Sequence, residues 1–128
     1  MKALLTLTAI VEAGAGLALL GLPSITASLL LGAPLVSVAA VSLARVGGAA
    51  IIALAIICWL VRDDGNSLAL RGLVVAMLFY NIAVGGVLVL AALGNGLHGM
   101  LLWPAVVFHV AMGVWCVISL RRAGVRAL

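Results

Sequence analysis

Four long apolar stretches constrain the fold of this chain more than any other feature of its sequence. They cover residues 4–22, 36–61, 73–93 and 101–120, and a helix needs about 20 mostly apolar residues to cross a bilayer. Hydrophobic residues make up 67% of the 128 residues and charged residues only 8%, which leaves little sequence for a soluble domain. No stretch alternates apolar and polar residues as a membrane barrel would. The sequence therefore predicts an all-α integral membrane protein, in which residues 1–128 form a single bundle of four transmembrane helices.

Turn-forming residues separate these stretches. Pro23 follows the first stretch in "GLPS", and Pro34 precedes the second in "GAP". The segments "RDDGNS" and "GNGLHG" form the other two connections, and "WPAV" opens the fourth helix. The first stretch follows a basic residue, as in a secretory signal, but Glu12 interrupts its apolar run and no small-x-small cleavage site follows directly. We expect this stretch to be retained as the first helix.

The distribution of Lys and Arg predicts the orientation. The connections "LPSITASLLLGAP" and "GNGLHG", on one side of the bundle, contain neither residue. Cytoplasmic loops collect basic residues, so both termini are expected in the cytoplasm. The formal charge of +4 then reflects membrane topology, and the basic end "RRAGVRAL" is expected to meet anionic lipid head groups. The basic residues on the predicted cytoplasmic side are Lys2, Arg62, Arg71, Arg121, Arg122 and Arg126.

Several function classes lack the residues that they need. The chain has no basic patch with interleaved aromatic residues, so nucleic-acid binding is not expected. Cys58 and Cys116 have no C-x-x-C spacing and are expected to be free thiols that hold no metal. We find no catalytic residues, because a nucleophile–base pair and a phosphate loop are both missing, and independent enzyme activity is not expected. Haem is not expected at His109, which lacks a second axial ligand at matching depth.

Each stretch carries a strongly polar group at a similar depth. Glu12 lies about eight residues, or ~12 Å, into the first helix, and Arg45 lies about nine residues, or ~14 Å, into the second from the opposite side. Tyr80 and Asn81 lie near the centre of the third helix and His109 near the centre of the fourth. Intramembrane ionisable residues nearly always face the bundle interior and pair with one another. We therefore expect these residues to converge in one layer near the bilayer midplane, with Glu12 and Arg45 as an ion pair.

Small residues accompany this polar layer. In "EAGAG", "NIAVGG" and "HVAMG", a glycine lies four residues after the polar residue. Such glycines let transmembrane helices approach closely and leave room for a side chain or a ligand. The recurrence between the first and third helices also resembles a parallel duplication of two-helix units. Ordinary helix packing explains the glycines about as well.

Several motifs resemble a known membrane family. The order of "LLGLPS", a short "LLLGAP" connection and an "ARVGGA" helix containing Arg45 resembles the DoxX-like four-helix membrane proteins of bacteria, and "AMLFYN" and "LLWPAVVFH" are similar to segments of small proteins of that type. The resemblance implies a four-helix fold in a bacterial inner membrane. Some DoxX-like proteins are subunits of quinone-linked thiosulfate oxidation, which implies a link to quinones. The resemblance supplies no catalytic residue.

A second resemblance is to the small multidrug resistance family. The segment "TAIVEAGAGLAL" is similar to the first helix of that family, which carries a proton-coupled Glu at the position of Glu12. The family's later Lys in this helix and its Tyr-Ala-x-Trp stretch are absent, and Arg45 has no counterpart there.

Three functional classes remain open at this point. In the first, which we favour, the layer of Glu12, Arg45, Tyr80, Asn81 and His109 binds a small amphipathic or quinone-like molecule, alone or in an accessory subunit of a membrane redox complex. In the second, Glu12 and His109 carry protons for a small-molecule transporter. In the third, the cluster only specifies helix packing and assembly, including assembly into a homo-oligomer.

Overall fold

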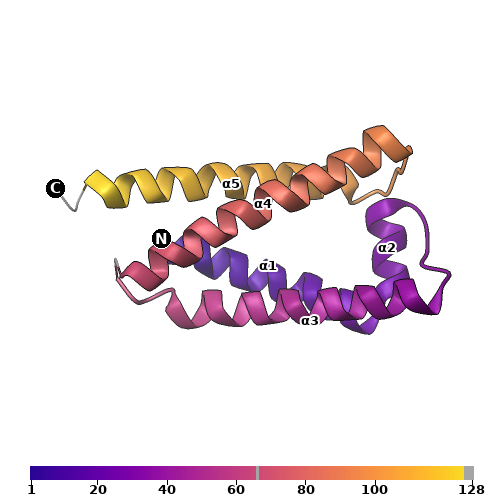
Figure 1. Ribbon diagram of the computed structural model, residues 1–128, viewed down its shortest axis with the longest axis horizontal. Helices are drawn as coiled ribbons and strands as arrows, with labels where there is room; N and C mark the ends of the chain where they lie inside the picture. The colour runs from indigo at the N-terminus through magenta and orange to yellow at the C-terminus, as the bar shows by residue number, and fades with distance from the viewer. Residues whose placement is uncertain (66, 126–128) are drawn as a thin grey trace.

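Most of the residues that the structure describes lie in five helices (Figure 1). A computed structural model describes residues 1–65 and 67–125, so Arg126 of the predicted cytoplasmic set lies outside the described residues. The described part contains no strand, which confirms the all-helical prediction. The helices are α1 (Lys2–Gly21), α2 (Pro23–Leu31), α3 (Val38–Val61), α4 (Leu68–Asn95) and α5 (Leu102–Val125).

Four of these helices are long and apolar enough to cross a membrane, as predicted. Their candidate spans are Lys2–Gly21, Val38–Val61, Leu68–Asn95 and Leu102–Ala123, with 20, 24, 28 and 22 residues. Serine N-caps explain why two helices begin at other residues than predicted. The Ser37 side chain accepts a hydrogen bond from the Ala40 N–H, so α3 begins two residues later than expected, and Ser67 caps Leu70 so that α4 begins earlier.

The short helix α2 is a feature that the sequence analysis missed, because we expected residues 22–34 to form a connection. Its nine residues are too few to span a bilayer. Pro23 occupies its first turn, and Gly32 ends it with a left-handed φ of 79°. This pairing of proline at the start with glycine after the end is typical of helices. The sequence therefore carried the signal for α2, and only the length of the segment concealed it.

The four long helices form two antiparallel hairpins (Figure 1). In the first, α1 packs on α3, and the Lys2 ammonium at the start of α1 reaches Asp63 just after α3. In the second, α4 packs on α5, and a Cβ placed on Gly85 would lie only 3.6 Å from the His109 Cβ. Close helix approach at small residues is the usual packing of transmembrane helices.

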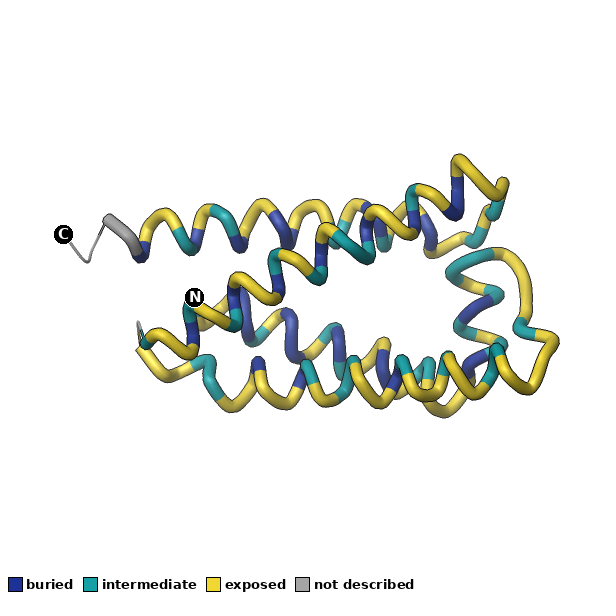
Figure 2. Tube along the Cα trace, viewed as in Figure 1, coloured by how far each residue is buried: buried dark blue, intermediate teal, exposed yellow. Residues whose placement is uncertain are grey.

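Two apolar clusters join the hairpins. One contains Leu5 of α1, Met77 of α4 and Met112 of α5, near the end where α1 begins. The other contains Leu88 and Leu102, against which α2 packs. The Leu101 N–H also donates to the Leu29 carbonyl at 2.9 Å, which ties α2 to the start of α5. Figure 2 shows that the outward faces of the helices are largely exposed, and their large apolar side chains suit contact with lipid.

Candidate functional site

A buried carboxyl group on α1 contacts a phenol on α4. Glu12 is 3% exposed, and its Oε2 accepts a 2.8 Å hydrogen bond from the Tyr80 hydroxyl. Tyr80 belongs to the second hairpin, so this bond is a polar link between the hairpins. A buried carboxyl group needs such a partner, because an unsatisfied polar group in an apolar interior is costly.

A second pair lies within the α4–α5 hairpin. The His109 Nδ1 lies 2.9 Å from the Asn81 Oδ1, while the Asn81 amide nitrogen donates to the Met77 carbonyl at 2.7 Å. Since the Asn81 oxygen is the acceptor, His109 must donate from Nδ1. A neutral imidazole in this tautomer leaves Nε2 as an acceptor.

Aromatic contacts join the two pairs. The rings of Tyr80 and His109 meet edge to face, with centroids 5.7 Å apart and planes at 73°. The Phe108 ring also meets the His109 ring edge to face, with centroids 5.6 Å apart and planes at 75°. Edge-to-face geometry is the preferred arrangement for such rings. Glu12, Tyr80, Asn81 and His109 thus form one connected set, which we call the polar cluster.

Arg45 does not belong to this cluster, and the predicted ion pair between Glu12 and Arg45 is wrong. Glu12 is buried and bonded to Tyr80, whereas Arg45 is exposed on α3 and lies within 4 Å of no carboxylate of the described residues. The register of α1 on α3 gives the reason. Gly16 lies against Gly48 and the following turn of α3, so Glu12 lies beyond that crossing, about two helical turns or ~10 Å from Arg45.

The exposed position of Arg45 can be reconciled with a membrane. Arg45 lies seven residues after the start of α3, or about 10 Å along the axis. Side chains of a helix incline toward its N-terminus, and long cationic side chains extend along apolar surface to keep the charge in water. The Arg45 guanidinium can therefore reach the nearer membrane surface instead of the bundle interior.

Two polar atoms of the cluster keep hydrogen-bonding capacity. Throughout the described part of the chain, every fully buried side-chain N or O atom has a partner. Glu12 Oε1 and His109 Nε2 have no hydrogen-bond partner within the described residues, so both atoms retain accessible surface. The cluster can therefore accept hydrogen bonds from a further molecule at two atoms.

Four members of the cluster were predicted from the sequence, but their contacts were not. Phe108 contacts His109 and the Met77 carbonyl accepts from Asn81, and neither group was predicted to belong to the site. The spacing in the sequence could have indicated both contacts, since Met77 lies four residues before Asn81 and Phe108 directly precedes His109. Among the described residues, no three His, Cys, Asp or Glu side chains gather as a metal site would require. Cys58 and Cys116 are free and buried.

No protein-family model matches this chain, and comparisons with curated proteins and with solved structures find no significant match.

Proposed function

We propose that this protein binds a small amphipathic, quinone-like molecule at the polar cluster within the bilayer. The observation that carries the proposal is the pair of free acceptor atoms, Glu12 Oε1 and His109 Nε2, in a cluster that extends across both hairpins. A dihydroxy aromatic head group presents two donors, and it could donate one hydrogen bond to each atom. An apolar tail would remain in the surrounding lipid.

The aromatic side chains support a flat head group. Tyr80, Phe108 and His109 present ring faces and edges in one layer. Ligand sites typically combine apolar and aromatic walls with a few fixed polar groups. Here Asn81 fixes the His109 ring through Nδ1, and Tyr80 fixes the Glu12 carboxyl group, so the two free atoms are held before any ligand arrives.

The wider setting is part of the same proposal. The DoxX-like motifs favour a bacterial inner membrane and a link to quinone chemistry, and the positions of Lys and Arg favour cytoplasmic termini. The protein would then act as a binding module, by itself, as a homo-oligomer or as an accessory subunit of a redox complex. Its own residues would supply hydrogen bonds and position, and the bound molecule would supply any redox chemistry.

Titration with a short-tailed benzoquinol tests the proposal. The full chain in lipid nanodiscs should bind the quinol saturably, beyond its partition into empty nanodiscs. His109→Gln and Glu12→Gln should each weaken binding by about tenfold, which corresponds to one hydrogen bond of about 1.4 kcal/mol. The matched controls are His98→Gln and Asp64→Asn, both at exposed loop positions, and neither should change the affinity. Unsaturable binding, or equal losses in variants and controls, would overturn the proposal.

Proton-coupled transport is a second candidate, and the free Oε1 of buried Glu12 favours it because a carrier needs a carboxyl oxygen that can receive a proton. In proteoliposomes with an internal pH dye, a transporter would move protons when an amphipathic cation gradient is imposed. Glu12→Gln would abolish this flux while Asp64→Asn would preserve it. Saturable quinol binding without any proton flux would select the first candidate.

A further inference from the structure

A cavity lies at the end of the bundle where α1 begins and where α3 and α5 end. Its volume is about 700 Å³, and it is distinct from the polar cluster. Three cationic side chains and a single carboxylate line it, so its charged groups carry a net positive charge. The polar and aromatic lining consists of Lys2, Arg62, Asp63, Trp115, Ser119 and Arg122. We call this space the basic cavity.

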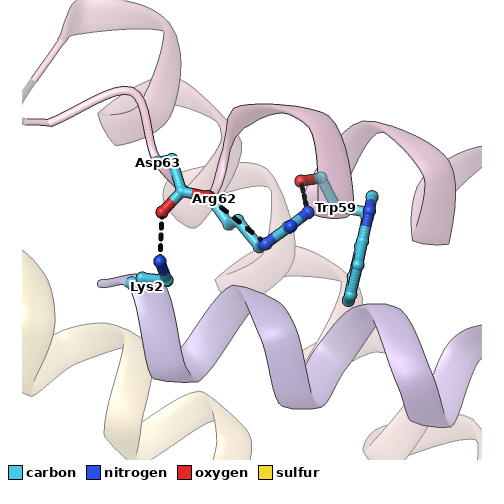
Figure 3. A network of polar contacts seen from close by, with 4 residues as sticks. All are labelled: Lys2, Trp59, Arg62 and Asp63. Carbon is cyan, nitrogen blue, oxygen red and sulfur yellow. Dashed lines mark hydrogen bonds and ion pairs between the residues drawn. The ribbon is translucent and has the colours of Figure 1, made fainter.

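Asp63 holds two of the three cations in place (Figure 3). Its carboxylate lies 2.5 Å from the Lys2 ammonium and 3.5 Å from the Arg62 guanidinium. The hydrogen bond from Lys2, together with the two positive charges, lowers the pKa of Asp63. Arg122 has no carboxylate within 4 Å among the described residues, so its charge remains available to a bound anion.

The Arg62 side chain also contacts a wall of a second, apolar cavity. Its guanidinium lies 3.5 Å from the centroid of the Trp59 ring and donates to the Trp59 carbonyl (Figure 3). Trp59 in turn lines a groove of about 300 Å³ between α1 and α3, whose other walls are apolar. These walls include Ala9, Ala13, Ile52, Ala55 and Ile56. We call this space the α1–α3 groove.

The helical register joins the two spaces. On α1, Lys2 and Ala9 are seven residues apart and therefore lie on the same side of the helix. On α3, Ala55 and Arg62 have the same spacing. The groove therefore runs from the charged end of the hairpin toward the middle of the bundle, along the same two helices that place Lys2 and Arg62 at the basic cavity.

We propose that one anionic phospholipid binds this end of the protein, with its phosphate head group in the basic cavity and one acyl chain in the α1–α3 groove. Basic pockets between transmembrane helices are known to hold anionic head groups. A guanidinium such as that of Arg122 matches a phosphate in charge and in hydrogen-bond geometry. A soluble anion would use only the charged half of this arrangement, whereas a phospholipid uses both halves.

The tryptophans support a position of this end near the membrane surface. Trp59 is 46% exposed and Trp115 is 37% exposed, and both lie in the same end of the bundle as the basic cavity. Tryptophan is enriched at the level of the lipid head groups, where one part of the ring is in apolar surroundings and the other is wet. At this position, a lipid phosphate would lie near the three cations.

Native mass spectrometry of the detergent-solubilised full chain tests the proposal. Dioleoyl phosphatidylglycerol should bind more tightly than dioleoyl phosphatidylcholine, and Arg122→Gln should weaken the phosphatidylglycerol complex by about fivefold, the effect expected for one cation near a lipid surface. Arg121→Gln is the matched control, because it removes the same charge from an exposed residue outside the cavity lining and should leave binding unchanged. Thermal unfolding of both variants verifies that they are folded.

Two further arms separate the lipid from a soluble anion. Dihexanoyl phosphatidylglycerol and inorganic phosphate should both bind more weakly than the dioleoyl lipid. Ala13→Leu, which fills the groove away from the charged end, should weaken the dioleoyl lipid and spare the dihexanoyl one. Equal binding of both head groups, equal losses in Arg121→Gln and Arg122→Gln, or phosphate binding as tight as the lipid would each overturn the proposal.

Discussion

Gly16 and Gly48 face each other where α1 crosses α3, and neither position has room for a Cβ. A Cβ on Gly16 would lie 2.8 Å from the Gly48 carbonyl oxygen, and a Cβ on Gly48 would lie 2.8 Å from the Gly16 carbonyl oxygen. Both obstacles are backbone atoms, which cannot rotate away as a side chain can. This contact fixes the register that brings Lys2 to Asp63 and separates Glu12 from Arg45.

Adding one methyl group at this crossing should destabilise the protein. We expect Gly16→Ala and Gly48→Ala each to lower the free energy of unfolding by about 1–3 kcal/mol, because the helices must move apart. Gly14→Ala and Gly86→Ala are matched controls, since a Cβ at either position meets nothing within 4 Å. The measurement is thermal or denaturant unfolding in a fixed detergent. Equal effects at all four positions would contradict the observed crossing.

The hydrogen bond between Tyr80 and Glu12 should appear in a double-mutant cycle. We expect Tyr80→Phe and Glu12→Gln to couple by about 0.6 kcal/mol in unfolding free energy, the average for interhelical hydrogen bonds in membranes, and by no more than about 1.7 kcal/mol. Arg45→Gln combined with Glu12→Gln should give additive losses, because these residues lie about two turns apart. Coupling of Glu12 to Arg45 in place of Tyr80 would show that the predicted ion pair forms after all.

The outcome for Arg45 shows what a single sequence can establish about such a site. Hydrophobic length alone identified the four candidate spans, because each helix must satisfy its backbone hydrogen bonds within itself. The depth of the polar residues was also predictable from the sequence, since Glu12, Asn81 and His109 each lie well inside a span. The rotation and register of one helix on another could not be predicted from the sequence. They depend on which small residues form the closest contact, here Gly16 and Gly48.

The partners of Tyr80 and Asn81 also could not be predicted from the sequence. Adjacent residues of a helix point about 100° apart, so one of them can face α1 while the other faces α5. The structure uses this difference, with Tyr80 bonded to Glu12 and Asn81 bonded to His109. The sequence placed both residues at the right depth, but it could not assign them to different partners. Similarly, α2 was missed because nine residues suffice for a connection as well as for a helix.

The His109 tautomer is a third testable consequence of the geometry. Because the Asn81 amide donates to the Met77 carbonyl, its oxygen must accept from His109 Nδ1. Nitrogen-15 NMR of histidine-labelled protein should show a protonated Nδ1 and an unprotonated Nε2 for this residue. Asn81→Ala should remove the preference, and His98→Gln serves to assign the two histidine signals. A protonated Nε2 with an unprotonated Nδ1 in the original chain would refute the assignment.

Acid should weaken the contact between Lys2 and Asp63. The hydrogen bond from Lys2 lowers the pKa of Asp63 in the folded protein. A lowered folded-state pKa means that the contact stabilises the fold above the unfolded value of about 3.9 and loses its effect as the pH falls through the folded value. The melting temperatures of the original chain and of Asp63→Asn should therefore differ at pH 6, and the difference should shrink as the pH falls below the unfolded value of about 3.9. The difference should be small, because both side chains are largely exposed. A difference that does not shrink in acid, or one that survives Lys2→Gln, would contradict this origin.

Labelling of single cysteines would decide the orientation that the basic residues predict. The loop between α3 and α4 carries Asp63 and Asp64 beside Arg62, whereas the loop between α4 and α5 has no Lys or Arg and leaves Met100 exposed. Basic residues stay on the cytoplasmic side during insertion, so Met100→Cys should react with a membrane-impermeant maleimide added to intact cells, and Asp64→Cys should react only after the cells are opened. The native thiols interfere little, because Cys58 and Cys116 are 0% and 1% exposed.

A charge variant tests the cause of the orientation. Replacing Arg62 and Arg71 by Gln removes the two basic residues that flank the α3–α4 loop. We expect this variant to insert in a mixed orientation, in which both cysteines are labelled in part from outside. Labelling of Asp64→Cys alone in intact cells would reverse the predicted topology and would place the basic cavity on the outer side of the membrane.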